Sequence, residues 1–206
     1  MSKLVYIFFV MGSVGLTAHI KFAYGGVTNA KAAELALHRV ERLVILKKIE
    51  EGFQYKVKSF TLELVPHQNE EEPSFKATLF QYPPKDPNQK PKAVTIRLDE
   101  EGKPIKEPPF VEGDGEADGA PQWPDKDPVT LAESALHYVL EGSVTKPELG
   151  PYHEGITEFT VTQEINQASE AVAVVDFKAK DQPILRVRIK MDASFDSSEF
   201  IPQTKE

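Results

Sequence analysis

The chain has 206 residues, of which 40% are apolar and 27% are charged, so it can bury a core, and the composition argues against wholesale disorder. It contains no cysteine, which excludes disulfide scaffolds, thiol nucleophiles and cysteine-ligated zinc sites. Its 24 Lys and Arg against 32 Asp and Glu give a formal net charge of −8, which argues against a nucleic-acid partner.

The amino terminus has the layout of a secretory signal peptide. Lys3 precedes an apolar run over residues 4–14, and no acidic residue occurs before Glu34. The apolar run is about a dozen residues long, which is short of the roughly 20 that cross a bilayer. We therefore expect residues 1–25 to be a signal peptide, the mature protein to be secreted or periplasmic, and no stable membrane span to remain after processing. The alternative is a buried strand, because residues 5–10 also show an alternating pattern.

The sequence matches itself in three places that follow one another in the same order. The matching segments are 33–40 with 132–139, 60–62 with 159–161, and 94–99 with 187–192. In the first match six of the eight positions are identical, and the change in offset from 99 to 93 falls within a loop. Such a series of matches predicts a duplicated structural unit.

Each half of the sequence is predicted to begin with an amphipathic helix, because apolar residues recur there at helical spacing. We expect these helices over residues 29–50, capped by Thr28 or Asn29, and over residues 128–142, capped by Asp127. Alternation of period two after each helix predicts three strands per half, and these lie near 55–64, 74–82 and 93–99, then near 156–165, 171–180 and 185–191.

The expected fold is α+β, with two repeated units that each pack one helix on an antiparallel sheet of three or four strands. The first unit spans residues 28–108, with a short fourth strand near 104–107, and the second spans residues 127–200. Between them, residues 109–126 are rich in acids, proline and glycine, which predicts a partly ordered connector.

This architecture, expected over about residues 28–200, resembles the cystatin-like superfamily, and its tandem form resembles the latexin type of carboxypeptidase inhibitor. The segment 95–105 is similar to the closing turn of the smaller exported PepSY-type modules. The resemblance implies an exported protein that inhibits or binds another protein. The two hairpins that correspond to the cystatin inhibitory loops, residues 66–73 and 166–170, lack the Gln-x-Val-x-Gly and Pro-Trp motifs. Any inhibitory role would therefore use another surface.

One acidic stretch of the connector approaches a calcium-binding loop. Its carboxylates Asp114, Glu116, Asp118 and Asp125 occupy positions 1, 3, 5 and 12, and Gly119 occupies position 6. Oxygen ligands at these positions could wrap a hard cation, although position 3 is usually Asp or Asn and position 12 is usually Glu. The alternative, which the sequence favours, is an acidic solvated connector. We therefore expect no cofactor, with calcium at this stretch as the alternative.

Two Glu–His pairs recur at i,i+4 spacing in the predicted helices, Glu34 with His38 and Glu133 with His137. Such a pair could hold a metal ion or relay a proton. The plainer interpretation is a surface pair that stabilises its helix by roughly 0.2–0.5 kcal/mol.

The sequence contains no nucleophile elbow, no phosphate-binding loop and no zinc-protease motif. We therefore expect an exported, non-catalytic binding module that engages a protein or peptide partner, with a protease as one candidate, and no nucleic acid. The alternative is a tandem hotdog-like enzyme that acts on acyl thioesters through Glu or His side chains of its helices.

Overall fold

The computed structural model describes residues 26–66, 73–105 and 109–203. The predicted signal peptide, residues 1–25, lies outside these ranges, as does most of the first predicted hairpin loop. The described residues form three α-helices, which are α1 (Asn29–Ile45), α2 (Pro128–Gly142) and α3 (Gly150–Gly155). They also form eight strands, which are β1 (Val57–Pro66), β2 (Pro73–Gln81), β3 (Ala93–Leu98), β4 (Phe110–Glu112), β5 (Ile156–Ile165), β6 (Ala171–Ala179), β7 (Ile184–Lys190) and β8 (Phe195–Ile201).

All eight strands of the described chain belong to one antiparallel sheet in the order β4-β3-β2-β1-β5-β6-β7-β8. The two halves join where Phe60 of β1 faces Phe159 of β5, and the two rings stack with their centroids 4.6 Å apart. The prediction of two repeated units, each one helix on its own sheet, is therefore wrong. Separate sheets would leave unpaired backbone groups along β1 and β5, and pairing these strands satisfies those groups and buries both rings.

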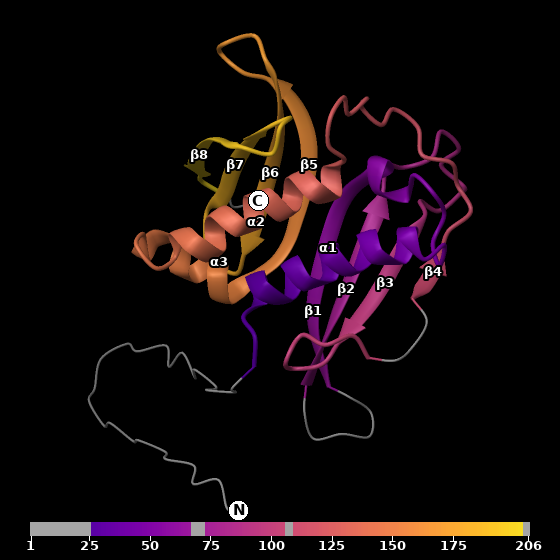
Figure 1. Ribbon diagram of the computed structural model, residues 1–206, viewed down its shortest axis with the longest axis horizontal. Coiled ribbons are helices and arrows are strands. Elements are labelled where there is room, and N and C mark those ends of the chain that lie inside the picture. The colour runs from indigo at the N-terminus through magenta and orange to yellow at the C-terminus, as the bar shows by residue number, and fades with distance from the viewer. Residues whose placement is uncertain (1–25, 67–72, 106–108, 204–206) are drawn as a thin grey trace, which may run out of the picture.

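The helices α1 and α2 lie side by side and antiparallel on one face of this sheet (Figure 1). Helix α1 contacts β2, β3 and β5, and α2 contacts β6, β7 and β8. Their apolar stripes, which include Leu37 and Val40 in α1 and Leu136 and Val139 in α2, are fully buried in a single core. One core is thus shared by both predicted units, because the two helices cover a continuous apolar sheet surface.

The helix starts follow the predicted capping residues. The Thr28 hydroxyl accepts a hydrogen bond from the Lys31 amide, and the Asp127 carboxylate accepts from the amides of Val129 and Thr130. Helix α2 ends at Gly142 as predicted, but α1 ends at Ile45 rather than near residue 50. Among the described helices, none has the length and apolarity that a bilayer crossing requires.

The strands predicted from alternation are present within about two residues of their expected ends. Two strands were not predicted, the short β4 inside the expected connector and β8 at the opposite edge of the sheet. Of the fourth strand expected near residues 104–107, residues 106 and 107 lie outside the described ranges. The described part forms a bridge between Pro104 and Leu98 and a hydrogen bond from the Ile105 amide to the Arg97 carbonyl.

Candidate functional site

Ionisable side chains gather where α1 and α2 face each other, and we call this region the interhelical seam. Because the helices run antiparallel, a residue late in one helix faces a residue early in the other. Three facing pairs follow from this arrangement, namely Glu41 with Thr130, His38 with Glu133, and Glu34 with His137. The seam therefore combines Glu and His residues that the sequence analysis paired along each helix.

At one end of the seam, which we call the closed end, hydrogen bonds surround Glu34. Only 7% of this residue is exposed to solvent. Glu34 Oε1 lies 3.0 Å from His137 Nδ1, and Lys31 donates to the other oxygen. The second nitrogen of His137 lies 3.3 Å from a Glu141 oxygen. Burial alone would raise the pKa of Glu34, but the hydrogen bonds from Lys31 and His137 outweigh it, so the pKa lies below its usual value. Glu34 is therefore held as a carboxylate.

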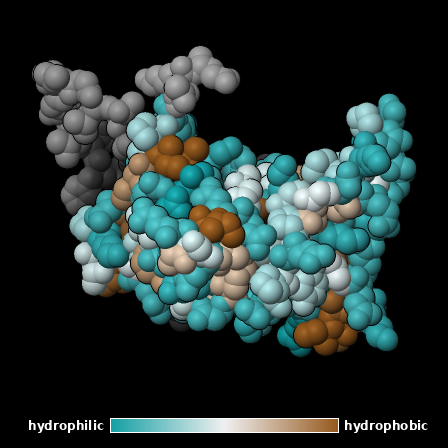
Figure 2. Space-filling model, turned by 90° about the horizontal axis from the view of Figure 1, so that it is seen from above, coloured by the Kyte–Doolittle hydropathy of each residue, from teal (hydrophilic) through white to brown (hydrophobic). Residues whose placement is uncertain are grey.

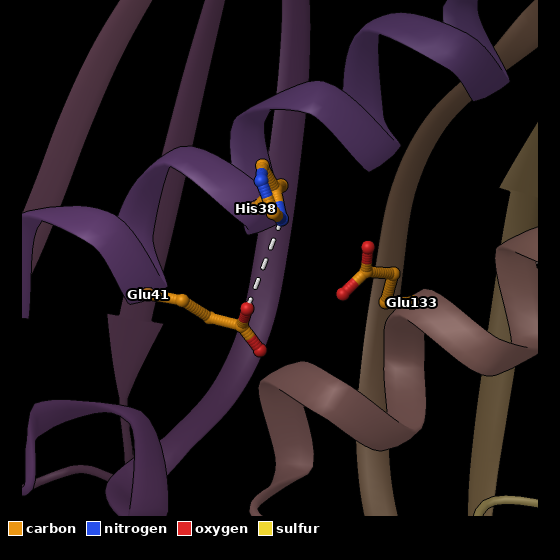
Figure 3. A group of neighbouring side chains, drawn as sticks. All are labelled: His38, Glu41 and Glu133. Carbon is orange, nitrogen blue, oxygen red and sulfur yellow. Dashed lines mark ion pairs between the residues drawn. The ribbon is translucent and has the colours of Figure 1, made fainter.

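The other end of the seam is open and holds His38, Glu41 and Glu133 (Figure 3). One ligand atom from each of the three lies within 4.8 Å of the others, and His38 Nδ1 is 3.9 Å from Glu41 Oε2. The Thr130 hydroxyl lies 3.1 Å from both Glu41 Oε1 and Asp127 Oδ2, so its single proton can be donated to either carboxylate. Burial and the negative charge of Glu41 raise the pKa of Glu133. An imidazole and two carboxylates in this arrangement can ligate a cation or exchange a proton.

A second candidate site is a pocket of about 420 Å³ in the half of the sheet formed by β1 to β4, which we call the β3 pocket. Residues of α1, β1, β2 and β3 line it together with the segments 104–105 and 109–112. Five of the lining residues are charged, three of them cations and two of them anions: Arg39, Lys76, Arg97, Glu63 and Glu112. The lining therefore has a net charge of +1, whereas the whole chain has a net charge of −8.

The cations of the β3 pocket differ in their partners. Lys76 lies 3.4 Å from Glu63, whereas Arg39 and Arg97 form no ion pair with any described residue. Elsewhere on the sheet the arginines are paired, as in the 2.7 Å contact between Arg186 and Asp176. Among the described residues, the two guanidinium groups are thus left without a carboxylate, the group that a guanidinium fork matches.

Apolar side chains form the rest of the β3 pocket. Phe80, Ile105 and Phe110 are among them, and Phe110 is 62% exposed although it belongs to a strand. The face of the molecule drawn in Figure 2 is mostly hydrophilic, with hydrophobic residues in separate spots rather than in one broad patch. Binding at the β3 pocket would combine charge recognition with a small apolar contact, because Phe80, Ile105 and Phe110 line it together with the charged residues.

The four predicted calcium ligands lie in a segment that is fastened to the loop between β2 and β3. The amide of Gly115 donates to the Lys90 carbonyl, the amide of Asp118 donates to the Pro83 carbonyl, and Trp123 is buried in the core. Glu116 lies 3.7 Å from both Lys56 and Lys92. Among the described residues, the group whose ligand atoms converge is His38, Glu41 and Glu133, and it includes none of the four connector acids. Calcium binding by Asp114, Glu116, Asp118 and Asp125 stays a prediction.

Four residues of the seam, Glu34, His38, Glu133 and His137, were predicted from their spacing in the sequence, whereas Glu41 and Thr130 were not. Glu41 follows His38 at i,i+3, which places both on one helix face, so this signal was present in the sequence. Thr130 offered no such signal, because its role depends on the helix packed against it. No family model, curated protein or solved structure matches the chain, so the cystatin-like resemblance also stays a prediction.

Proposed function

We propose that this protein is a non-catalytic binding module that holds an extended peptide segment of a partner protein in the β3 pocket. The segment carries carboxylate side chains next to apolar ones. The observation that carries the proposal is the pair of arginines, Arg39 and Arg97, that line the pocket without an ion pair to any described residue. The predicted signal peptide over residues 1–25 would place the partner outside the cytoplasm.

The chemistry of the two arginines favours a carboxylate-bearing ligand. A guanidinium group presents a planar set of donors that matches a carboxylate, and a charge-assisted hydrogen bond contributes about 1.5–3 kcal/mol when one partner is charged. The net charge of −8 disfavours acidic ligands over the surface on average. An acidic segment would therefore be directed to this pocket rather than bound over the whole surface.

The shape and the apolar wall of the pocket favour a peptide over a free anion. Its volume of about 420 Å³ lies within the range of roughly 300–1,000 Å³ that is typical of ligand pockets. Phe80 and Phe110 offer aromatic surface next to the charged groups. In an extended peptide, successive side chains point to opposite sides. A glutamate can therefore contact an arginine while the apolar residue next to it points away from that arginine.

Fluorescence anisotropy with labelled octapeptides that alternate Glu with Phe or Leu tests the proposal. We expect these peptides to bind the full chain, and matched peptides with Gln in place of Glu to bind at least tenfold more weakly. The variants Arg39→Gln and Arg97→Gln should each weaken binding of the acidic peptides by about tenfold, the loss of one charge-assisted hydrogen bond.

The variant Arg42→Gln is the matched control, because it removes the same charge from the exposed side of α1 outside the pocket lining. It should leave peptide affinity unchanged. Equal losses in all three arginine variants would show that only net charge matters, and equal binding of the Glu and Gln peptides would refute the proposed ligand.

A further inference from the structure

We propose that His38, Glu41 and Glu133 form a binding site for a divalent first-row transition metal ion of the Zn²⁺ type, and that the bound ion ties α1 to α2 at the open end of the interhelical seam. This site is separate from the β3 pocket, so the inference goes beyond the proposed function and does not depend on it.

The three side chains converge from two helices on one point. His38 and Glu41 project from α1, and Glu133 projects toward them from α2 (Figure 3). Their ligand atoms all lie within 4.8 Å of one another. A tetrahedral ion with bonds of about 2.1 Å separates its ligand atoms by roughly 3.4 Å. Since none of the three residues is fully buried, modest side-chain rotations can close the difference.

The charges at the open end of the seam favour the binding of a cation. Neither Glu41 nor Glu133 pairs with a lysine or arginine of the described chain, and the basic group beside them is His38. At the closed end, by contrast, Glu34 has both Lys31 and His137. Two carboxylates held close together repel each other, and a divalent ion between them converts this repulsion into attraction.

The types of ligand atom at this site indicate which ion it would bind. Ca²⁺ prefers six to eight oxygen ligands, whereas an imidazole nitrogen with carboxylate oxygens suits Zn²⁺ and its first-row neighbours. When the Thr130 hydroxyl donates to Glu41 Oε1 rather than to Asp127 Oδ2, each 3.1 Å away, it orients the Glu41 carboxylate for binding. An open hollow of about 410 Å³ adjoins Glu133; residues of α2 line it together with Ala193 and Phe195, whereas His38 and Glu41 lie outside its lining.

Isothermal titration of ZnCl₂ into the full chain tests the site, with Co²⁺ as a spectroscopic substitute. We expect one ion per chain, an absorption band of Co²⁺ typical of low coordination number, and a rise in melting temperature on binding. The variants His38→Gln and Glu133→Gln should each lower the affinity at least tenfold and weaken the Co²⁺ band. Both replacements are close in size, and the His38 side chain is 69% exposed, so the fold should persist, as circular dichroism would verify.

The controls remove similar groups away from the three ligands. His153→Gln removes an imidazole that pairs with Glu154, and Glu141→Gln removes a carboxylate that contacts His137. Both should bind Zn²⁺ as the unmodified chain does. The proposal is overturned if the unmodified chain binds no ion at a defined stoichiometry, or if His38→Gln and Glu133→Gln bind as it does. A larger loss in His137→Gln, or in a variant with Asp114 and Asp118 changed to Asn, would also overturn it.

Discussion

The two ends of the interhelical seam contain the same pair of residue types and differ in what surrounds them. At the closed end, Glu34 and His137 lie within hydrogen-bonding distance and Lys31 completes the cluster. At the open end, His38 and Glu133 face each other without a hydrogen bond in the described structure, and Glu41 adds a second carboxylate.

The decisive difference lies three residues before each glutamate. That position holds Lys31 in α1 and Thr130 in α2. Lys31 pairs with Glu34, whereas the Thr130 hydroxyl lies within hydrogen-bonding distance of Glu41 and Asp127 rather than of Glu133. A lysine at this spacing satisfies a buried carboxylate, whereas threonine leaves its charge uncompensated. The presence of a Glu and a His therefore does not decide whether their contact is structural or free to bind a ligand. The residue three positions before the glutamate decides it.

We expect the largest difference between the two ends when the glutamate of each end is removed and the loss in free energy of unfolding is compared. Glu34→Ala leaves Lys31 and His137 without their shared acceptor and should lower the free energy of unfolding by about 1–2 kcal/mol. Glu133→Ala removes a repelled carboxylate and should change it by less than about 0.5 kcal/mol. Urea denaturation of both variants in metal-free buffer measures the difference, and equal losses would contradict the distinction between the two ends.

Replacing the lysine of the closed end by the residue of the open end should have a smaller effect. Lys31→Thr removes one cation from Glu34 but keeps the contact to His137, so we expect a loss of about 0.5–1 kcal/mol. Lys126→Thr is the matched control, because Lys126 is exposed and forms no ion pair with the described residues. Urea denaturation of both variants should be compared at low ionic strength. If Lys126→Thr loses as much stability as Lys31→Thr, the loss reflects the change in net charge rather than the contact with Glu34.

The smallest effect expected is a difference in pH dependence. The pKa of Glu34 in the folded protein lies below 4.5, because its hydrogen bonds to Lys31 and His137 exceed the cost of burial. Its contribution to stability is therefore present above pH 4.5 and is lost as the pH falls through the folded pKa. The pKa of Glu133 is raised above 4.5 by burial and by Glu41, so its contribution is present below pH 4.5 and is lost as the pH rises through the folded pKa.

Urea denaturation between about pH 3 and pH 7 measures these two contributions separately. The stability difference between the unmodified chain and Glu34→Gln should grow in favour of the unmodified chain as the pH rises. The difference for Glu133→Gln should shift in the opposite direction. Parallel profiles for the two variants would mean that the ends of the seam are electrostatically alike.

Local structure was predicted where a short stretch of sequence carries the whole physical reason. Asp127 followed by Pro128 starts α2 because both residues act within the first turn. Alternation produces β5 because Phe159 and Val161, two positions apart, are buried on the same face. The strand β8 escaped prediction because its residues include polar side chains on both faces and most of them are exposed or half-buried.

The candidate sites show the same division between local and distant causes. The residues Glu34, His38, Glu133 and His137 were identified from their spacing, but they were paired along each helix. Hydrogen bonding across the seam depends instead on the antiparallel contact of α1 with α2. The β3 pocket was not predicted at all, because Arg39 and Arg97 are 58 positions apart and belong to different elements.

The sequence by itself determined the helix caps, most of the strands and the kinds of ionisable side chains that line the helices. The tertiary structure alone decided that β1 pairs with β5 to make one sheet, and that Glu34 meets His137 while Glu133 meets His38 and Glu41. Caps and alternation act between residues a few positions apart, so they can be recognised in a single segment. Strand pairing and helix packing join segments about 100 residues apart, and their outcome depends on how the whole chain buries its apolar surface.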